Sequence, residues 1–244
     1  FGALMYDSDA RLNVPVTIYR GIHPTPQKHI TLGALFAEIV SDDVEKIAAS
    51  RRMSDCYKKH LVEQDKKEAK KEYEEQKSQL NGFSMGEFSY RNDKKENCIQ
   101  YIPCFVFDLD GCKSMEDALS FQQKLATLPY IFASFPSPSG HGLRLFVWVS
   151  ATYETHRIIY THVLKSLCTD LGITTDKKKG IHFDSTCQNE SRFFYYTHLS
   201  KEDFYLNLES VVFEVPIPKD IFEKKNIKEN VDVNELMYQL DTQL

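Results

Sequence analysis

The sequence contains no apolar run long enough for an α-helix to cross a bilayer, and its first residues carry no secretory signal. We therefore expect a cytoplasmic protein with no membrane partner. The sequence also contains no CxxC pair, and its six cysteines lack the spacing of a disulfide framework or a zinc module. Free thiols are favoured over a zinc site drawn from Cys98, Cys104 and Cys112 with a distant histidine, so no zinc is expected.

An excess of basic residues is absent too. The 30 lysines and arginines are outnumbered by 35 aspartates and glutamates, which gives a net charge of −5. Proteins that bind nucleic acid over a wide surface usually have a basic face, although a local basic patch fits within an acidic total. Hydrophobic residues (42%) and charged residues (27%) are at levels typical of a soluble globular protein. Composition therefore leaves the function to local motifs.

The first third of the chain, over 14–80, predicts one strand followed by charged helices. Residues 14–22 are rich in β-branched and aromatic side chains, which favours a strand. Thr31 is placed to cap a helix over 32–40. Lysine and glutamate then alternate at helical spacing over 65–79, a pattern typical of a solvated helix rather than of a DNA-binding arm.

The middle of the chain predicts a β-α-β-β-α-β order, preceded by an aromatic segment that alternates like an edge strand. That segment is 83–91, and the following elements are expected at 102–110, 114–128, 130–135, 143–149, 152–171, 181–185 and 192–197. The order is the split βαβ arrangement of ferredoxin-like and RRM folds. We therefore predict an α+β fold: a domain over 1–218 with its catalytic core at about 83–215, and a helical tail or linker over 219–244.

In this arrangement the first core strand lies between the third and the last. Asp108 and Asp110 end that first strand, and because they are two residues apart their side chains leave the same face. Asp184 follows the short apolar strand at 181–185. Neighbouring carboxylates repel unless a cation neutralises them, and Mg²⁺ and Mn²⁺ prefer oxygen ligands. The alternative is a pair of strand-end aspartates that cap a turn at Gly111.

The turn over 137–144, SPSGHGLR, contains groups that suit a triphosphate. Ser137 and Ser139 offer hydroxyls, two glycines let backbone amides approach an anion, and His141 and Arg144 add positive donors. The alternative is an ordinary hairpin turn, in which serine, proline and glycine are common.

Four further basic residues are weaker candidates for contacts with phosphate or nucleic acid: Arg91, Lys177, Lys178 and Arg192.

The order FDLDG, SPSGHGLR, FDS resembles the three motifs of the archaeo-eukaryotic primase (primase-polymerase) superfamily. Residues from about 14 to 215 resemble the VirE-type N-terminal primase domain of mobile elements. The likeness rests on the charged helix before NGFSMGEFSYR, on PSPSGHGLRLFVWV and on SRFFYY. It implies that Asp108, Asp110 and Asp184 are catalytic residues that hold two Mg²⁺ or Mn²⁺ ions.

The resemblance also implies that Ser139 and His141 hold the triphosphate of the incoming nucleotide. Some relatives place the basic residue later, where this chain has Arg144, so the choice between His141 and Arg144 stays open. The implied activity is that of a DNA primase or primer-extending polymerase in the replication of a mobile element. Its implied partners are a single-stranded DNA template, nucleoside triphosphates, and a helicase or another replication domain.

Two other functions compete with this hypothesis. FVFDLDG is similar to the nucleophile strand of haloacid-dehalogenase-type phosphatases, in which Asp108 would attack phosphate and Asp110 would act as acid and base. Against this, Cys112 stands where that family usually has threonine or valine, and no late paired-aspartate motif follows. The other competitor is a non-catalytic nucleic-acid-binding module that keeps the primase fold.

Overall fold

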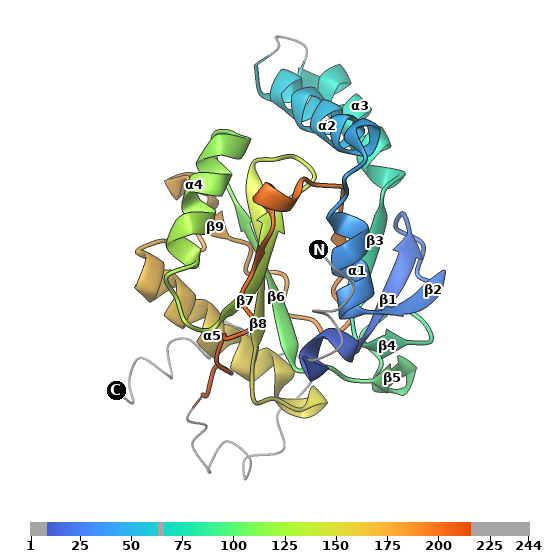
Figure 1. Ribbon diagram of the computed structural model, residues 1–244, viewed down its shortest axis with the longest axis vertical. Coiled ribbons are helices and arrows are strands. Elements are labelled where there is room, and N and C mark those ends of the chain that lie inside the picture. Colours follow the sequence, from blue (N-terminus) through green and yellow to red (C-terminus); the bar gives the residue numbers. More distant parts are fainter. Residues whose placement is uncertain (1–8, 63–65, 216–244) are drawn as a thin grey trace.

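Two antiparallel sheets pack face to face in the computed structural model, which describes residues 9–62 and 66–215 (Figure 1). The stacked rings of Phe83 and Phe146, 5.8 Å apart, join one sheet to the other. Together with five α-helices the sheets form an α+β fold, which confirms the predicted fold class. The expected tail over 219–244 lies outside the described residues.

The larger sheet contains the predicted core. Its strands are β6 (Cys104–Asp110), β7 (Ile131–Pro136), β8 (Gly142–Trp148), β9 (His182–Phe183) and β11 (Tyr205–Leu206), and its helices are α4 (Met115–Leu125) and α5 (His156–Leu171). The strand order is β11-β7-β8-β6-β9, so β6 lies between β8 and β9 as the split βαβ arrangement requires. The extra strand β11 extends the edge beyond β7.

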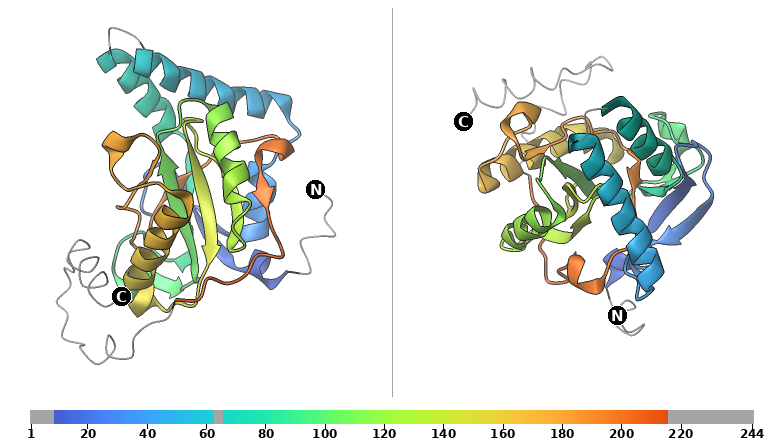
Figure 2. Two further views of the ribbon diagram at one scale, coloured as in Figure 1. Left: turned by 90° about the vertical axis from the view of Figure 1, so that its left-hand side faces the viewer. Right: turned by 90° about the horizontal axis from the view of Figure 1, so that it is seen from above.

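The helix ends follow the expected capping rules. The Ser114 hydroxyl accepts a hydrogen bond from the backbone N–H of Asp117 at the start of α4. Gly172 ends α5 in the left-handed conformation, with φ of 64°, which glycine adopts without strain. Helices α4 and α5 cover one face of the larger sheet, and α1 (Leu32–Ile39) and the smaller sheet lie at the other (Figures 1 and 2).

The smaller sheet corrects two predictions. Its strands are β1 (Pro15–Arg20), β2 (Lys28–Thr31), β3 (Asn81–Met85) and β10 (Phe194–Tyr195), in the order β10-β3-β1-β2. The strand expected at 192–197 was wrongly assigned to the core sheet: β10 pairs with β3, because Phe194 opposite Phe83 fills the space between the sheets. For the same reason β3 is an inner strand and not the expected edge.

The remaining elements are short. A separate ribbon pairs β4 (Glu87–Phe88) with β5 (Cys98–Gln100), and 3-10 turns span Ala10–Asn13, Lys95–Asn97, Tyr153–Thr155, Lys177–Lys179 and Lys201–Asp203. All six cysteines are free thiols, as expected. In the described part of the chain, no helix is long and apolar enough to pass through a membrane.

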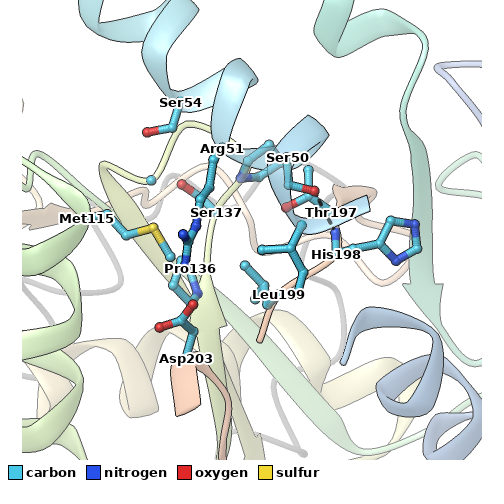
Figure 3. Close-up of a pocket in the computed structure, with 13 residues that line it drawn as sticks. Ser50, Arg51, Ser54, Met115, Pro136, Ser137, Thr197, His198, Leu199 and Asp203 are labelled. Carbon is cyan, nitrogen blue, oxygen red and sulfur yellow. Dashed lines mark hydrogen bonds between the residues drawn. The ribbon is translucent and has the colours of Figure 1, made fainter. Parts of the chain in front are cut away.

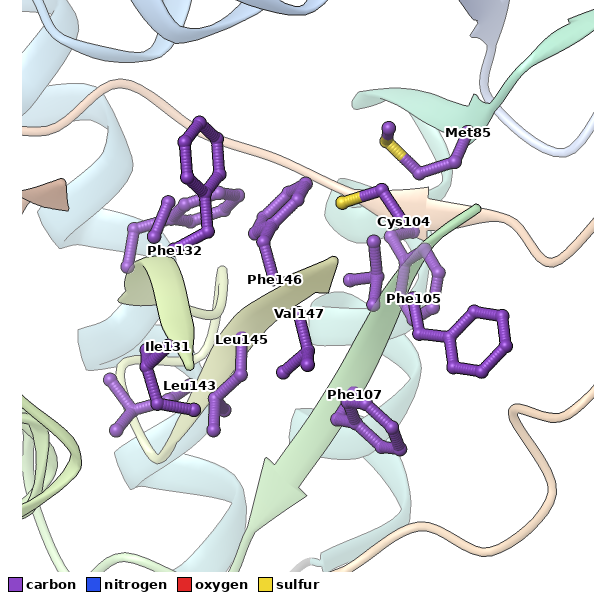
Figure 4. Close-up of a cluster of buried hydrophobic side chains, with 14 of the residues drawn as sticks. Met85, Cys104, Phe105, Phe107, Ile131, Phe132, Leu143, Leu145, Phe146 and Val147 are labelled. Carbon is purple, nitrogen blue, oxygen red and sulfur yellow. The ribbon is translucent and has the colours of Figure 1, made fainter. Parts of the chain in front are cut away.

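Alternation along β6 and β8 separates two faces of the core (Figure 4). Phe105 and Phe107 lie against Tyr160 of α5, with ring centroids 5.5 and 4.5 Å apart. On β8, Phe146 faces the other way and contacts Phe36 of α1 at 5.3 Å. Asp108 is two residues from Val106, which pairs with Phe146, so its side chain leaves β6 toward the smaller sheet.

Helices α2 (Val44–Val62) and α3 (Lys66–Ser78) form a hairpin that projects from one end of the sheets (Figures 1 and 2). The hairpin has its own small apolar cluster of Met53, Cys56 and Tyr73. The solvated helix predicted over 65–79 is therefore correct for only part of α3, because Tyr73 lies in this cluster.

Candidate metal and nucleotide site

The last residues of β6 place two carboxylates next to an arginine. Asp108 lies directly opposite Arg144 in the β6–β8 pairing, and the Arg144 guanidinium donates to the Asp108 carboxylate in an ion pair. The two side chains are only 13% and 6% exposed, respectively, so this pair is shielded from water. Asp110 lies opposite Gly142, where an added Cβ would stand 3.0 Å from the Asp110 carboxylate and 2.2 Å from a backbone oxygen. The turn backbone therefore comes close to Asp110.

The third predicted carboxylate, Asp184, lies next to Asp108. The backbone N–H of Asp184 donates to the Asp108 carbonyl oxygen over 2.8 Å and continues the pairing of β9 with β6. The Asp184 carboxylate accepts hydrogen bonds from the backbone and hydroxyl of Thr186, and Arg192 lies 3.6 Å from its other oxygen. One ligand atom each from Asp108, Asp184 and Cys187 lie within 4.8 Å of one another.

The environments of Asp110 and Asp184 shift their pKa values in opposite directions. Burial raises the pKa of Asp110, and the negative charge of Asp184 adds to this, while His182 and Lys77 oppose it. Burial also acts on Asp184, but the Thr186 hydrogen bonds and the charge of Arg192 outweigh it and lower the pKa of that carboxyl. Asp110 is thus a carboxylate whose charged form an added cation would stabilise.

The donor set fits a hard divalent cation. The carboxylate oxygens at the end of β6 and just after β9 are of the kind that Mg²⁺ and Mn²⁺ prefer. Cys187 offers sulfur, but burial raises the pKa of its thiol to about 12, and the protonated thiol donates to Asp184 over 3.6 Å. Sulfur is a soft ligand that Mg²⁺ and Mn²⁺ take less readily than oxygen, so the carboxylates are the expected donors.

The turn between β7 and β8 is buried and well hydrogen-bonded. The hydroxyl oxygens of Ser137 and Ser139 are 3.0 Å apart, and Ser139 accepts from the backbone N–H of His141. Because the Ser139 carbonyl oxygen can only accept, the His141 ring carries a proton on Nδ1, 2.8 Å away. The ring also lies 4.8 Å from that of Tyr57 on α2. The turn is thus held against both Asp110 and the hairpin.

The four weaker candidates divide into two groups. Arg192 pairs with Asp184, and the charge of Lys177 lowers the pKa values of Asp110 and Asp184, so both lie at the site. Lys178 is exposed on the neighbouring 3-10 turn.

Arg91 lies elsewhere. It donates to the carbonyl oxygen of Ile22, and its guanidinium stacks 4.6 Å from the Phe193 ring. These contacts are structural.

The hairpin contributes residues that the sequence analysis missed. Two of them, Tyr73 and Lys77, lie one helical turn apart on α3 and face the site. The charges of Arg144 and Asp110 affect the pKa values of both residues. The signal available in the sequence was Tyr73 itself, a large aromatic residue in an otherwise charged helix four residues before a lysine.

A pocket lies beside the turn. It is bounded by α2, by Pro136–Gly140 and by the segment 197–203, and Arg51 reaches across it toward Asp203 (Figure 3). None of the three carboxylates is among the residues that line it. We therefore do not assign the active centre to this pocket.

Comparison with known proteins finds a family model that matches part of the chain. Residues 75–187, less than half of the chain, match the family described as BT4734-like, N-terminal domain. This segment contains the three carboxylates and the turn. No match was found among curated proteins.

Among solved structures, the chain is similar to the polymerase domain from Mycobacterium tuberculosis ligase D in complex with DNA. The identity is 12% and the TM-score 0.30, over 68% of this chain and 61% of that one. The chain therefore spans less than two thirds of the length of that protein. A likeness at this level does not bear on activity.

Proposed function

We propose that this chain is a metal-dependent nucleotidyltransferase that makes or extends a primer on single-stranded DNA, in the replication of a mobile element with a helicase or another replication domain. The observation that carries the proposal is the convergence of the Asp108 and Asp184 carboxylates beside Arg144 and Arg192, with Asp110 at the same end of β6. Acidic residues from separated parts of the chain and two arginines at one place suit a reaction between a nucleotide triphosphate and a hydroxyl.

In this proposal Asp108, Asp110 and Asp184 hold Mg²⁺ or Mn²⁺. Two bound ions would lower the pKa of an attacking 3′-hydroxyl and stabilise the charge of the leaving pyrophosphate. The Arg144 guanidinium keeps N–H groups beyond its contact with Asp108, including a buried Nε without a hydrogen-bond partner, and these donors can bind a phosphate oxygen. Ser139 and His141 position the turn backbone around the triphosphate.

The test uses the whole chain with a single-stranded DNA template, labelled nucleotides, and Mg²⁺ or Mn²⁺. We expect template-dependent products that disappear when a chelator removes the metal. Asp108→Asn and Asp184→Asn should lower incorporation by roughly a hundredfold or more, because each removes a charged group from the transition-state environment. Glu75→Gln on the exposed side of α3 is the matched control and should be unaffected.

A second measurement is the shift in melting temperature on adding Mn²⁺. A ligand that binds only the folded chain stabilises it by about 2.7 kcal/mol at a hundred times its dissociation constant. The shift should be present in Glu75→Gln and lost in Asp110→Asn. Equal incorporation by all variants, or by none, contradicts the proposal, and phosphate release without template favours a phosphatase instead.

A further inference from the structure

Lys77 differs from the other lysines of α3. Lys70 and Lys71 form i,i+4 ion pairs with Glu74 and Glu75 at 3.6 and 3.7 Å, and all four side chains are more than half exposed. Lys77 is only partly exposed and lies on the face of α3 that turns toward the larger sheet. Its position is therefore not that of a solvated surface lysine.

Two aromatic rings hold the Lys77 side chain. Its Nζ lies 5.4 Å from the ring centroid of Tyr195 on β10 and 5.7 Å from that of Tyr73 on α3. Tyr73 is fixed in turn by the apolar cluster of the hairpin and by Tyr57, 4.9 Å away. The ammonium group is thus placed between the hairpin and the nearby end of the two sheets. The aromatic rings stabilise its positive charge but do not neutralise it.

Lys77 lacks the close ionic partner that the two neighbouring arginines have. Arg144 pairs with Asp108, and Arg192 pairs with Asp184. Within residues 9–62 and 66–215, Lys77 has no carboxylate within ion-pair distance, although Asp110 and Glu74 act on it from farther away. Burial lowers the pKa of Lys77, and the positive charges of Arg144 and Arg192 lower it further. A phosphate group beside Lys77 would supply the close negative partner that the described carboxylates do not provide.

We propose that Lys77 binds a phosphate group of a nucleotide held at the carboxylate site, which makes α3 part of the binding machinery. The inference rests on the proposed function for the identity of the ligand. Two sources offer the same chemistry: the triphosphate of a free nucleotide and the backbone phosphate of a DNA strand. Lysine is a suitable residue for either, because its ammonium binds phosphate as a compact point charge.

The experiment measures binding, so its outcome is separate from that of the incorporation assay. The affinity of the whole chain is determined for a nucleoside triphosphate with Mg²⁺, by calorimetry, and for a fluorescent single-stranded DNA, by anisotropy. Three variants are compared with the native chain: Lys77→Gln, Lys77→Arg, and Lys71→Gln as the control of equal charge change on the same helix.

Lys77→Gln should weaken binding of one or both ligands about tenfold or more, as expected for loss of a charge-assisted contact. Lys77→Arg should stay close to the native chain, and this variant keeps the test informative if Lys77→Gln does not fold. If the affinity falls for the triphosphate alone, Lys77 binds a phosphate of the free nucleotide. If the affinity falls for DNA alone, Lys77 binds a backbone phosphate of the DNA strand. Lys77→Gln and Lys71→Gln behaving alike with both ligands overturns the inference, and so does a native chain that binds neither.

The two proposals fail in different ways. In one outcome the native chain incorporates no nucleotide, while Lys77→Gln binds the nucleotide or the DNA more weakly than the native chain does. That outcome contradicts the proposed polymerase activity and supports the phosphate contact. A chain that incorporates nucleotides while Lys77→Gln binds both ligands normally supports the activity and removes Lys77 from the site.

Discussion

The hydrogen bond from the Asp184 backbone N–H to the Asp108 carbonyl oxygen aligns the two carboxylates along adjacent strands. It extends the β6–β9 pairing one step beyond Leu109 and Phe183. Main-chain bonds therefore fix the separation of the two residues along the backbone, independently of the contacts that their side chains make. For this reason we expect aspartate-to-asparagine variants at the site to keep the fold while they change its chemistry.

The ion pair between Arg144 and Asp108 gives the first stability prediction. Burial lowers the pKa of Arg144 to about 10, so the guanidinium is still charged at neutral pH. Arg144→Leu leaves the Asp108 carboxylate shielded and unpaired, which should cost about 3–5 kcal/mol in the free energy of unfolding by urea. Adding Asp108→Asn should recover most of the loss. The exposed Lys71→Gln should change stability by about 0.5 kcal/mol at most. A double variant as unstable as Arg144→Leu alone contradicts this account.

Gly140 gives a prediction with an internal control. Its φ of 69° and the φ of 64° at Gly172 both favour glycine, so alanine at either position should cost about 1–2 kcal/mol from strain. An added Cβ at Gly172 meets nothing within 4 Å, whereas at Gly140 it would stand 2.6 Å from the Ser54 hydroxyl of α2. Gly140→Ala should therefore lower the melting temperature more than Gly172→Ala.

Removing the Ser54 hydroxyl should relieve the steric part of that difference. Gly140→Ala with Ser54→Ala is expected to melt near Gly172→Ala, because the left-handed strain remains and the collision does not. If Ser54→Ala restores nothing, the hairpin does not rest on the turn in the way the structure shows.

His156 should make stability depend on pH. It is buried against Phe105 and bonded to the Tyr101 hydroxyl, and burial lowers its pKa to about 3. The unfolded chain protonates this histidine near pH 6.5 and the folded chain does not, so its contribution is complete above pH 6.5 and is lost as the pH falls toward 3. The slope from this group reaches about 1.4 kcal/mol per pH unit.

The measurement is urea unfolding from pH 4 to pH 8. His156→Gln should flatten the curve between pH 4 and 6.5 relative to the native chain, while His23→Gln, at an exposed turn, should leave it unchanged. A native curve that is already flat over this range contradicts the prediction.

Much of the larger sheet could be predicted from the sequence because its elements are long and strongly patterned. The capping Ser114, the terminal Gly172 and the apolar strand ending in Asp108 each carry a local signal. The two neighbours of β6 in the sheet, β8 and β9, then followed from the predicted β-α-β-β-α-β order. The pairing of β10 with β3 could not be read in the same way, because a two-residue strand has no periodicity and its partner is chosen by Phe194.

The candidate site was predictable only where its residues lie on those strands. The sequence indicates that Asp108, Asp110 and Asp184 can meet; the structure brings ligand atoms of Asp108 and Asp184 within 4.8 Å of each other, and the charge of Asp184 acts on Asp110. The ion pair of Asp108 with Arg144 depends on which residue of β8 lies opposite Asp108. The pattern of apolar residues predicts which face of a strand each side chain leaves, but it does not predict this cross-strand register. Lys77 was hidden because its helix has the composition of a solvated one, and only tertiary packing distinguishes it from Lys71.

The place of β10 in the smaller sheet has a consequence for the order of synthesis. Strands β1, β2 and β3 leave the ribosome early, yet the outer side of β3 stays without its partner until Phe194 and Tyr195 have been made. An unpaired strand side is prone to join other chains, and pairings between residues far apart in sequence form slowly. Nascent chains truncated before β10 should therefore aggregate more readily than the completed one.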